Sequence, residues 1–314
     1  MPNDPQVPWN DEQWARVNQV VQEEARRARV AATFLPLYGP LDADADFVRD
    51  QPITYPPMAM MGFLIPGREQ LNIGDRDTIR LATLQVTVPV RNAQMADPEL
   101  SSALALFRRA ANVVARLEDA VVFRGLARSP VARAALGPYQ PPGGLVGLPD
   151  IWQISGALAA RGLWSRAVPP AQRIRIQLMP AITRGNRLVS AISAAIGRLE
   201  GNGHFGPFAV VLGQRLFLVA QTPDPTSLVL PQDRIIPFLG GGPLLRSSTL
   251  DDFNQFSGVV VALGGAPVEL VVASDVSLQF LQVTSEPAFV FRVYEKIALR
   301  IKEPKAIAQL YIET

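Results

Sequence analysis

The side chains that most often carry enzymatic chemistry are scarce in this chain of 314 residues. Cysteine is absent, and His204 is the one histidine. Thiolate-bound zinc, iron–sulfur clusters, cysteine nucleophiles and two-histidine metal sites are therefore excluded. A histidine-dependent triad would have to use His204, and no nucleophile motif lies near it. We expect no metal and no cofactor.

The segment 201–206, Gly-Asn-Gly-His-Phe-Gly, matches the G-x-G-x-x-G pattern of dinucleotide-binding sites. Such a site needs a strand before the glycines and a helix after them, so that the helix N-terminus can hold the pyrophosphate. Here the order is reversed, because a predicted helix over 188–199 leads in and a predicted strand over 208–212 leads out. The spacing therefore predicts a glycine-rich turn and no nucleotide site.

Glu118 and Asp119 are adjacent carboxylates that could be examined as a catalytic pair. They are adjacent on a predicted helix, so their side chains point about 100 degrees apart and cannot form the facing pair of a glycosidase. Arg116 and Arg124 lie close to them in the sequence. This arrangement predicts ion pairs with a neighbouring element.

Asp42, Asp44 and Asp46 are spaced like the start of a calcium loop. That loop needs glycine at position six and glutamate at position twelve. Phe47 and Ile53 stand at these positions instead, so we exclude a calcium site. An enzyme with a carboxylate-only site would need a convergent pair in a pocket, and the sequence indicates none.

The composition restricts the class of protein further. Apolar residues make up 48% and charged residues 18% of the chain, whereas about 25% charged residues is usual. The net charge is +2 without a basic block, so nucleic-acid binding is not indicated. Every apolar run is shorter than the roughly 20 residues of a membrane span, and no signal peptide is recognisable. We therefore expect a cytoplasmic protein without a membrane partner, whose apolar surplus lies in a large core or a wide subunit interface.

The first predicted element is a helix from about Asp11. Asn10 and Gln13 have the spacing of a capping box, and Trp9 can pack on Trp14 as a hydrophobic staple. Apolar residues recur every three or four positions and form one narrow stripe: Trp14, Val17, Val21, Ala25 and Ala28. Such a stripe can pack on the core of its own domain and still leave a groove beside it for a peptide.

Two segments predict a long hairpin that projects from the domain. Residues 51–74 are rich in proline, glycine and methionine without a helical period, and residues 78–90 alternate between apolar and polar. The alternation slips between Leu81 and Leu84, which predicts a β-bulge. A projecting hairpin is not stable alone in water, so it needs a neighbouring surface.

A long helix and a strand-rich C-terminal region complete the expected elements. Asp97 and Pro98 predict the helix start, and the apolar period continues to Gly125, which gives a helix of about 39 Å. The stretch 129–180 is irregular, and a second α+β unit follows it. The clearest strand of the C-terminal region has an apolar and a charged face: Phe289, Phe291, Val293, Ile297, Leu299 and Ile301 on one, and Arg292, Lys296, Arg300 and Lys302 on the other.

Four blocks of sequence resemble, in this order, the encapsulins, which are nanocompartment shell proteins of bacteria and archaea with the HK97 phage-capsid fold. The blocks are Asp11–Trp14 running on to Tyr38–Leu41, Leu117–Asp119 to Phe123–Gly125, Gly203–Phe208 to Arg215–Leu216, and Phe291–Val293 to Leu310. They cover both ends and some of the middle of the chain. The N-terminal helix favours an encapsulin over a phage capsid protein, whose corresponding region is usually an arm or a scaffolding segment.

The resemblance implies an α+β protein with the HK97 capsid-like fold in four regions. These are an N-terminal helix and arm (1–40), an E-loop hairpin region (41–96), a P-domain with the long spine helix (97–128 and 256–314), and an inserted A-domain (129–255). Residues 129–180 do not match the family, and we expect them to add a feature to the outer surface of the A-domain.

The resemblance also implies a function. The chain would be a non-enzymatic shell protein that assembles with itself into a hollow icosahedral particle and packages a cargo enzyme through the enzyme's C-terminal targeting peptide. The matching positions are Val17, Val21, Phe34 and Leu37 for the peptide groove on the inner wall, and Asp224, Pro225 and Thr226 for the loop of a five-fold pore. The alternative is a phage or prophage capsid protein that packages DNA.

Overall fold

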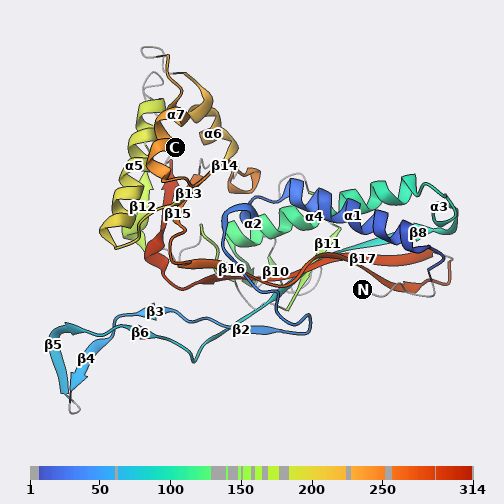
Figure 1. Ribbon diagram of the computed structural model, residues 1–314, viewed down its shortest axis with the longest axis horizontal. Coiled ribbons are helices and arrows are strands. Elements are labelled where there is room, and N and C mark those ends of the chain that lie inside the picture. Colours follow the sequence, from blue (N-terminus) through green and yellow to red (C-terminus); the bar gives the residue numbers. More distant parts are fainter. Residues whose placement is uncertain are drawn as a thin grey trace.

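The computed structural model places two β-sheets, each covered by helices, beside a long projecting hairpin (Figure 1). The residues that it describes are 7–60, 63–128, 139–140, 148–149, 151–156, 160–164, 169–176, 184–223, 228–251, 257–286 and 288–312. Among these, no helix has the length and apolar character needed to cross a membrane.

The N-terminal helix, α1 (Asp11–Ala28), begins where the capping box predicts it. Asn10 Oδ1 accepts a hydrogen bond from the Gln13 backbone N–H at 2.8 Å, and Gln13 Oε1 accepts one from the Asn10 N–H at 3.1 Å. The Trp9 and Trp14 rings meet edge to face, with their centroids 5.1 Å apart. The capping box and the hydrophobic staple are therefore both confirmed.

The spine helix, α4 (Ser101–Arg124), has 24 residues and is therefore about 36 Å long. It starts at Ser101, later than predicted. The Asp97 carboxylate accepts hydrogen bonds from the N–H groups of Glu99 and Ser101, and Leu100 has a left-handed φ of 52°. This turn satisfies free N–H groups at the helix start and replaces the first helical turn that we expected.

The first five-stranded sheet packs against α1 and α4, and we call this layered unit the P-domain (Figure 1). Its strands, in order across the sheet, are β1 (Leu37–Tyr38), β16 (Val268–Val283), β17 (Ala288–Ile301), β8 (Ala82–Arg91) and β11 (Trp152–Ser155). β16 and β17 are antiparallel, and their register shifts between Val272 and Ser277, which indicates a bulge in β16. Apolar side chains of both helices and the sheet form one core.

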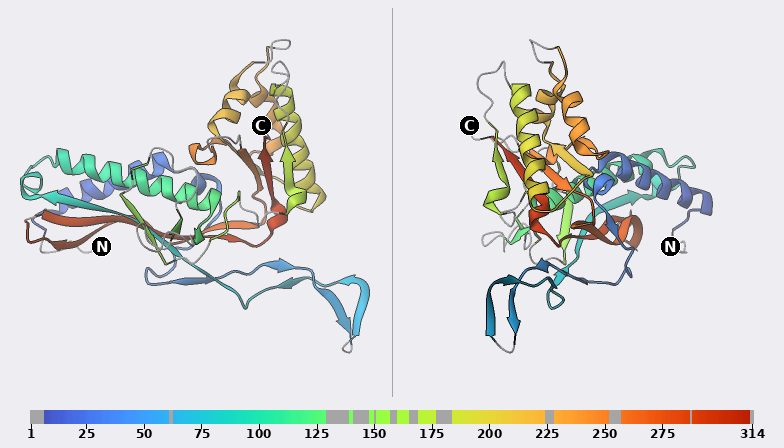
Figure 2. Two further views of the ribbon diagram at one scale, coloured as in Figure 1. Left: turned by 180° about the vertical axis from the view of Figure 1, so that it is seen from behind. Right: turned by 60° about the vertical axis from the view of Figure 1, so that its left-hand side comes forward.

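The projecting hairpin consists of three short strand pairs (Figures 1 and 2). They are β2 (Phe47–Arg49) with β7 (Thr78–Arg80), β3 (Ile53–Thr54) with β6 (Asn72–Ile73), and β4 (Pro57–Met60) with β5 (Phe63–Glu69). The predicted strand over 78–90 is divided at Leu81, whose N–H donates to Asp46 O and whose side chain is buried. Its second half, β8, lies in the P-domain sheet, so the expected hairpin region 41–96 includes a strand of that sheet.

The second five-stranded sheet forms the A-domain, which rises from one end of the P-domain (Figure 2). Its strands are, in order, β12 (Arg173–Arg175), β18 (Ile307–Tyr311), β15 (Ser257–Ala262), β13 (Phe208–Leu212) and β14 (Leu244–Arg246). The helices α5 (Arg184–Gly201), α6 (Gln214–Gln221) and α7 (Pro231–Ile235) pack with it around a separate core. β15 and β18 fall in the range 256–314 that we expected in the P-domain. They pair here because β13 and β15 are buried along their whole length and need a partner on each edge.

Short elements complete the described chain. They are α2 (Ala31–Phe34), α3 (Asn92–Met95), β9 (Ala127–Arg128) paired with β10 (Tyr139–Gln140), and 3₁₀ turns at 170–172, 236–239, 248–250 and 304–306. The glycine-rich segment 201–206 connects α5 to β13, which confirms the predicted helix-to-strand turn. Within 129–180, β11 extends the P-domain sheet and β12 extends the A-domain sheet.

The base of the hairpin is fastened to the P-domain by a buried arginine. Arg300 lies on the face of β17 that we predicted to be charged, yet it is 1% exposed. Its guanidinium binds the Glu269 carboxylate and donates to Arg49 O at 3.3 Å and to Gln51 Oε1 at 3.2 Å. The centre of the Tyr38 ring lies 4.1 Å from its Cζ atom. The hairpin base and β1 therefore cover this side of the sheet.

We expect Arg300→Met to lower the free energy of unfolding by about 3 kcal/mol or more. The substitution leaves the buried Glu269 carboxylate with Lys302 as its remaining cationic partner in the described structure. Denaturant unfolding followed by circular dichroism measures the change.

The matched control is Arg292→Met, on the same face of β17. Arg292 donates to the neutral side chains of Gln279 and Gln85, so its loss leaves no buried charge and costs about 1 kcal/mol. Equal losses in the two variants would contradict the anchoring role of Arg300.

Candidate functional site

The N-terminal arm, residues 11–38 with α1, α2 and β1, carries the predicted peptide-binding positions. Val17 and Val21 are 0% and 1% exposed and Phe34 is 7% exposed, whereas Leu37 is 60% exposed. The first three side chains belong to the P-domain core. Leu37 is thus the one predicted position that a ligand can reach in the single subunit.

Other apolar side chains of the arm are partly open to solvent. They are Val20 on α1, Val30 between the helices, and Ala32 on α2. We call these three residues and Leu37 the arm surface. We did not predict the first three of these positions from the sequence. The predicted apolar stripe packs into the core, whereas a ligand meets the side chains beside the stripe.

The arm bends at an elbow between the end of α1 at Ala28 and the start of α2 at Ala31. The Asp119 carboxylate of α4 accepts hydrogen bonds from the Val30 N–H at 2.9 Å and from the Ala31 N–H at 2.7 Å. It supplies the cap that the Val30 side chain cannot provide. Burial raises the pKa of Asp119 to about 7, while these hydrogen bonds and Arg29 act in the opposite direction.

Three further carboxyl groups meet beside Asp119 at Arg29, which directly follows α1. One guanidinium nitrogen of Arg29 is 2.7 Å from Asp275 of β16, and 3.8 Å from both Glu118 of α4 and Glu295 of β17. Glu118 and Glu295 are fully buried, and their oxygens accept no hydrogen bond from any amide, guanidinium or hydroxyl group in the described structure. We call these five residues the elbow cluster.

Glu118 and Glu295 lie within hydrogen-bond reach of each other. Burial raises the pKa of Glu118 well above its ordinary value, and the charge of Glu295 adds to this effect. Burial, followed by the charge of Asp275, raises the pKa of Glu295 to about 8. The raised pKa values of both groups favour protons on the pair at neutral pH.

The sequence predicted some of this arrangement. Glu118 forms an ion pair with Arg29 of a neighbouring element, as expected, whereas Asp119 accepts hydrogen bonds from backbone N–H groups of the elbow. The convergent pair forms between Glu118 and Glu295, which we did not single out. The signal was present, because Glu295 shares the alternating phase of Val293 and Ile297 on the buried face of β17, where an acidic residue is unusual.

The elbow cluster lacks the features of a catalytic or metal site. Its two central carboxyl groups are sealed from solvent, so no substrate can reach them in this conformation. Across the portion of the chain that the structure describes, no three histidine or acidic side chains are arranged to hold a metal ion.

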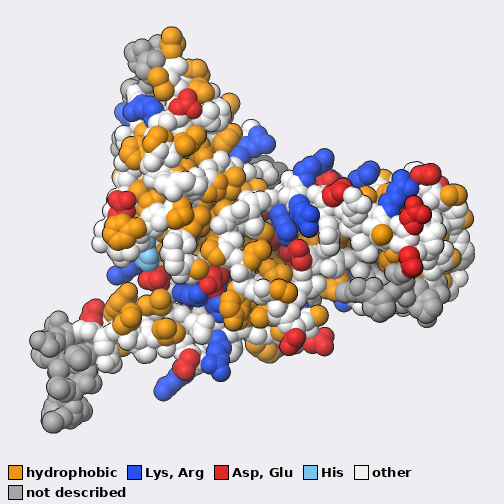
Figure 3. Space-filling view, viewed as in Figure 1, with side chains coloured by type: hydrophobic (Ala, Val, Ile, Leu, Met, Phe, Trp, Pro, Cys, Tyr) orange, Lys and Arg blue, Asp and Glu red, His pale blue; other side chains and the backbone are white. Residues whose placement is uncertain are grey.

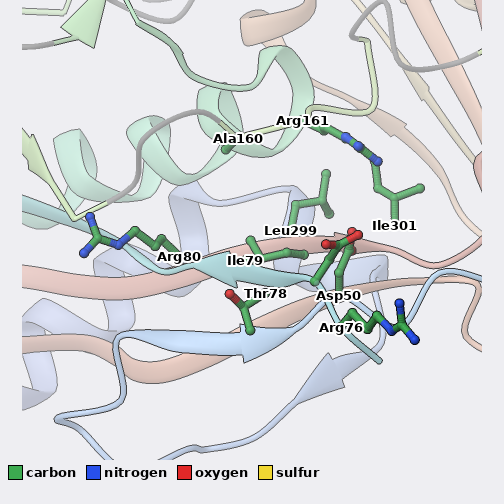
Figure 4. A pocket seen from close by; sticks show the side chains of 10 residues that line it. Asp50, Arg76, Thr78, Ile79, Arg80, Ala160, Arg161, Leu299 and Ile301 are labelled. Carbon is green, nitrogen blue, oxygen red and sulfur yellow. The ribbon is translucent and has the colours of Figure 1, made fainter. Parts of the chain in front are cut away.

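Two clefts of about 470 Å³ lie near the base of the hairpin. Asp50, Arg76, Arg80 and Arg161 are among the residues that line the first (Figure 4). Tyr55, Glu69, His204, Glu303 and Lys305 are among those that line the second. His204 is 9% exposed, and its Nε2 atom lies 3.8 Å from Glu303. The nearest charged neighbour of His204 in this cleft is therefore an acid.

The predicted pore loop, Asp224, Pro225 and Thr226, lies outside the described residues, between α6 and α7. Its role stays a prediction.

The fold is that of virus-like shells. A virus-like particle from Pyrococcus furiosus matches with a TM-score of 0.64 and 14% identity, over 95% of this chain and 99% of that chain. The capsid of Myoviridae phage XM1 matches with a TM-score of 0.59 and 10% identity, over 90% of this chain and 91% of that one. The chain therefore has the α+β, HK97 capsid-like fold that we expected.

Sequence comparison narrows this class. The family model described as an encapsulating protein for peroxidase, Linocin_M18, matches residues 3–132 and 166–298. The type 1 encapsulin shell protein EncA of Myxococcus xanthus (strain DK1622) is 29% identical, over 96% of this chain and 93% of its own length. The chain belongs to this family, the encapsulin shell proteins. The gap in the family match falls within the stretch 129–180 that we expected not to match.

We expect Asp119→Ala to loosen the elbow, because it removes the acceptor for two N–H groups at the start of α2. The free energy of unfolding should fall by about 1 to 3 kcal/mol, and hydrogen–deuterium exchange of residues 30–34 should rise. Asp119→Asn is the matched variant, since its amide oxygen can still accept from these N–H groups. If both variants exchange alike, Asp119 does not cap α2.

Proposed function

We propose that this chain is a non-enzymatic shell subunit of a cytoplasmic nanocompartment. It assembles with copies of itself into a hollow icosahedral particle and packages a cargo enzyme, without nucleic-acid or membrane partners. In this family the projecting hairpin is the E-loop, which packs on neighbouring subunits. The observation that carries the proposal is the apolar surface of that hairpin.

Tyr55, Leu71 and Ile73 of the E-loop are 52%, 71% and 56% exposed. Apolar side chains gather along this projection (Figure 3), which is built from two-stranded pairs, and none of the three residues belongs to either core. A hairpin of this kind has no core of its own and gains stability from burial on another surface. A second copy of the chain is the surface that a closed shell supplies to every hairpin.

The A-domain carries further exposed apolar side chains on α6, on the segment before α7 and on the turn after α7. They are Leu218, Leu228, Ile236 and Phe238. We propose that the end of the A-domain with the loop between α6 and α7 meets its symmetry mates around the five-fold axis, where Asp224, Pro225 and Thr226 line the pore. The net charge of +2 is low enough for like subunits to pack without strong repulsion.

The arm surface is our proposed binding site for the C-terminal targeting peptide of the cargo. Leu37 would contact the apolar side chains of the peptide directly. Val17, Val21 and Phe34 would support the site indirectly, because their burial in the core holds the arm in position. The family description names a peroxidase as the encapsulated protein, so a peroxidase is the first cargo to test.

Assembly is tested by adding charge to the E-loop. Leu71→Asp places a carboxylate on an exposed apolar position, so it should leave the subunit folded but prevent shell formation. Negative-stain electron microscopy and size-exclusion chromatography give the result, with a circular dichroism spectrum as the check on folding. Asn72→Asp adds the same charge at the next position, on the opposite face of the strand, and should still assemble.

A stable monomer or dimer of the unaltered protein would contradict the shell proposal. Uniform hollow particles with the absorbance ratio of pure protein would support it. Particles filled with nucleic acid would favour the phage-capsid alternative instead.

Cargo binding is tested by Leu37→Asp in particles that are co-expressed with a peroxidase from the same organism. We expect peroxidase that carries its C-terminal tail to co-purify with unaltered shells and to be lost, by about tenfold or more, from the variant. Leu106→Asp makes the same change on α4, outside the arm, and should retain cargo. Retention by Leu37→Asp, or equal packaging of tail-deleted peroxidase, would refute the assignment.

A further inference from the structure

We propose that Glu118 and Glu295 form a pH-operated latch for the N-terminal arm. Protons on the two carboxyl groups keep the elbow docked on the P-domain, and their loss in alkaline solution releases the elbow and loosens α1. The latch deepens the proposed function and rests on it, because the arm carries the proposed cargo site.

The position of the pair makes it suitable as a latch. Glu118 and Asp119 are consecutive residues of α4, and Asp119 holds the first N–H groups of α2. Arg29, one residue before Val30, contacts Glu118 and Glu295 from the arm side. A change in the charge of the pair therefore acts directly on the point where α1 turns into α2.

The charges around the pair come from every element packed against it. The helix α4 contributes Asp119, the elbow contributes Arg29, and β16 contributes Asp275. Arg116, also on α4, acts on Asp119. The neighbouring strand β8 places a neutral leucine opposite Glu295. With both acids of the pair protonated, the carboxylates of Asp119 and Asp275 face the Arg29 guanidinium.

Full ionisation of the pair adds two negative charges at this site. Four carboxylates would then face Arg29, and two of the four would be buried within hydrogen-bond reach of each other without a proton between them. Ionised carboxylates are costly in a buried site unless water or a cation reaches them. Separation of the elbow from α4 and β17 admits water to the pair.

The direction of the pH effect follows from the bound proton. In the released arm the carboxyl groups are in water and give up their protons near the ordinary value of 4.5. In the docked arm the raised pKa values, about 8 for Glu295, keep the proton bound. Docking is therefore most stable at low pH, weakens as the pH rises above 4.5, and stops weakening once the docked pair is itself ionised.

Asp119 titrates in a neighbouring range, and the test must separate it from the pair. Its pKa is about 7, so it contributes mainly below neutral pH. Between about pH 7 and pH 9 the remaining pH dependence of docking belongs to Glu118 and Glu295.

The experiment is hydrogen–deuterium exchange of assembled, full-length particles, with protection factors corrected for the intrinsic effect of pH on exchange. For the unaltered protein we expect the protection of residues 11–34 to fall about tenfold or more between about pH 7 and pH 9. Protection of β13 in the A-domain serves as the internal reference and should not change. A flat profile for residues 11–34 would overturn the latch.

The variant E118Q/E295Q replaces both acids by neutral side chains of the same shape. We expect its protection to stay constant over this pH range, within about twofold. Asp275→Asn is the matched control, because it removes a charge that contacts Arg29 but leaves both acids of the pair in place. It should keep the pH dependence, shifted to lower pH, since Asp275 helps to raise the pKa of Glu295. An unchanged pH profile in E118Q/E295Q would overturn the assignment.

A second measurement uses the unaltered protein, so it does not depend on whether a variant folds. Infrared spectroscopy of the unaltered particles should detect the C=O band of a buried, protonated carboxylic acid at neutral pH, and this band should weaken as the pH rises to about 9. Its absence at neutral pH would overturn the latch.

Peroxidase retention on the same particles separates the latch from the cargo proposal. If the arm loosens with pH and tailed peroxidase is released in parallel, both stand. If the arm loosens and the peroxidase stays bound, the latch stands and the arm surface is not the cargo site.

Discussion

The burial of α4 between the sheet and the N-terminal arm is the constraint on which the rest of the structure depends. One side of the helix packs on β8 and β17, and the other side packs on α1 and α2. A helix that is covered on both sides must be apolar around most of its circumference, and residues 117–123 are all buried. Any polar group in this stretch needs a partner inside the protein. Asp119 finds it in the backbone of α2, and Glu118 finds it in a second carboxyl group.

The same packing leaves the hairpin without a core of its own. Arg300 fastens the hairpin base to the sheet through Glu269 and Gln51, but nothing in the described chain covers Leu71 or Ile73 further out. The apolar residues of this charge-poor chain therefore serve two purposes. Some of the apolar surplus fills the two cores, and the remainder stays on surfaces that a single subunit exposes.

Local signals were sufficient for many of the elements. The capping box at Asn10 located the start of α1, and the apolar run 208–212 located β13, because caps and short-range periodicity act within a few residues. Prediction failed where distant segments of the chain decide the outcome. Leu81 ends the hairpin strand because it is drawn into the core. β15 and β18 join the A-domain because β15 pairs with the buried strand β13 and itself needs β18 on its other edge.

Several features of this protein follow from the amino-acid sequence alone. They are the helix positions, the glycine-rich turn, the absence of thiol and two-histidine chemistry, and the likeness to encapsulins. These features depend on residue type and on neighbours along the chain. Three others were decided by tertiary structure alone: the burial of Arg300, the inward direction of Val17 and Val21, and the meeting of Glu118 with Glu295. Each depends on which distant segment comes to lie opposite a side chain, and that is set when the sheet, the spine helix and the arm pack together.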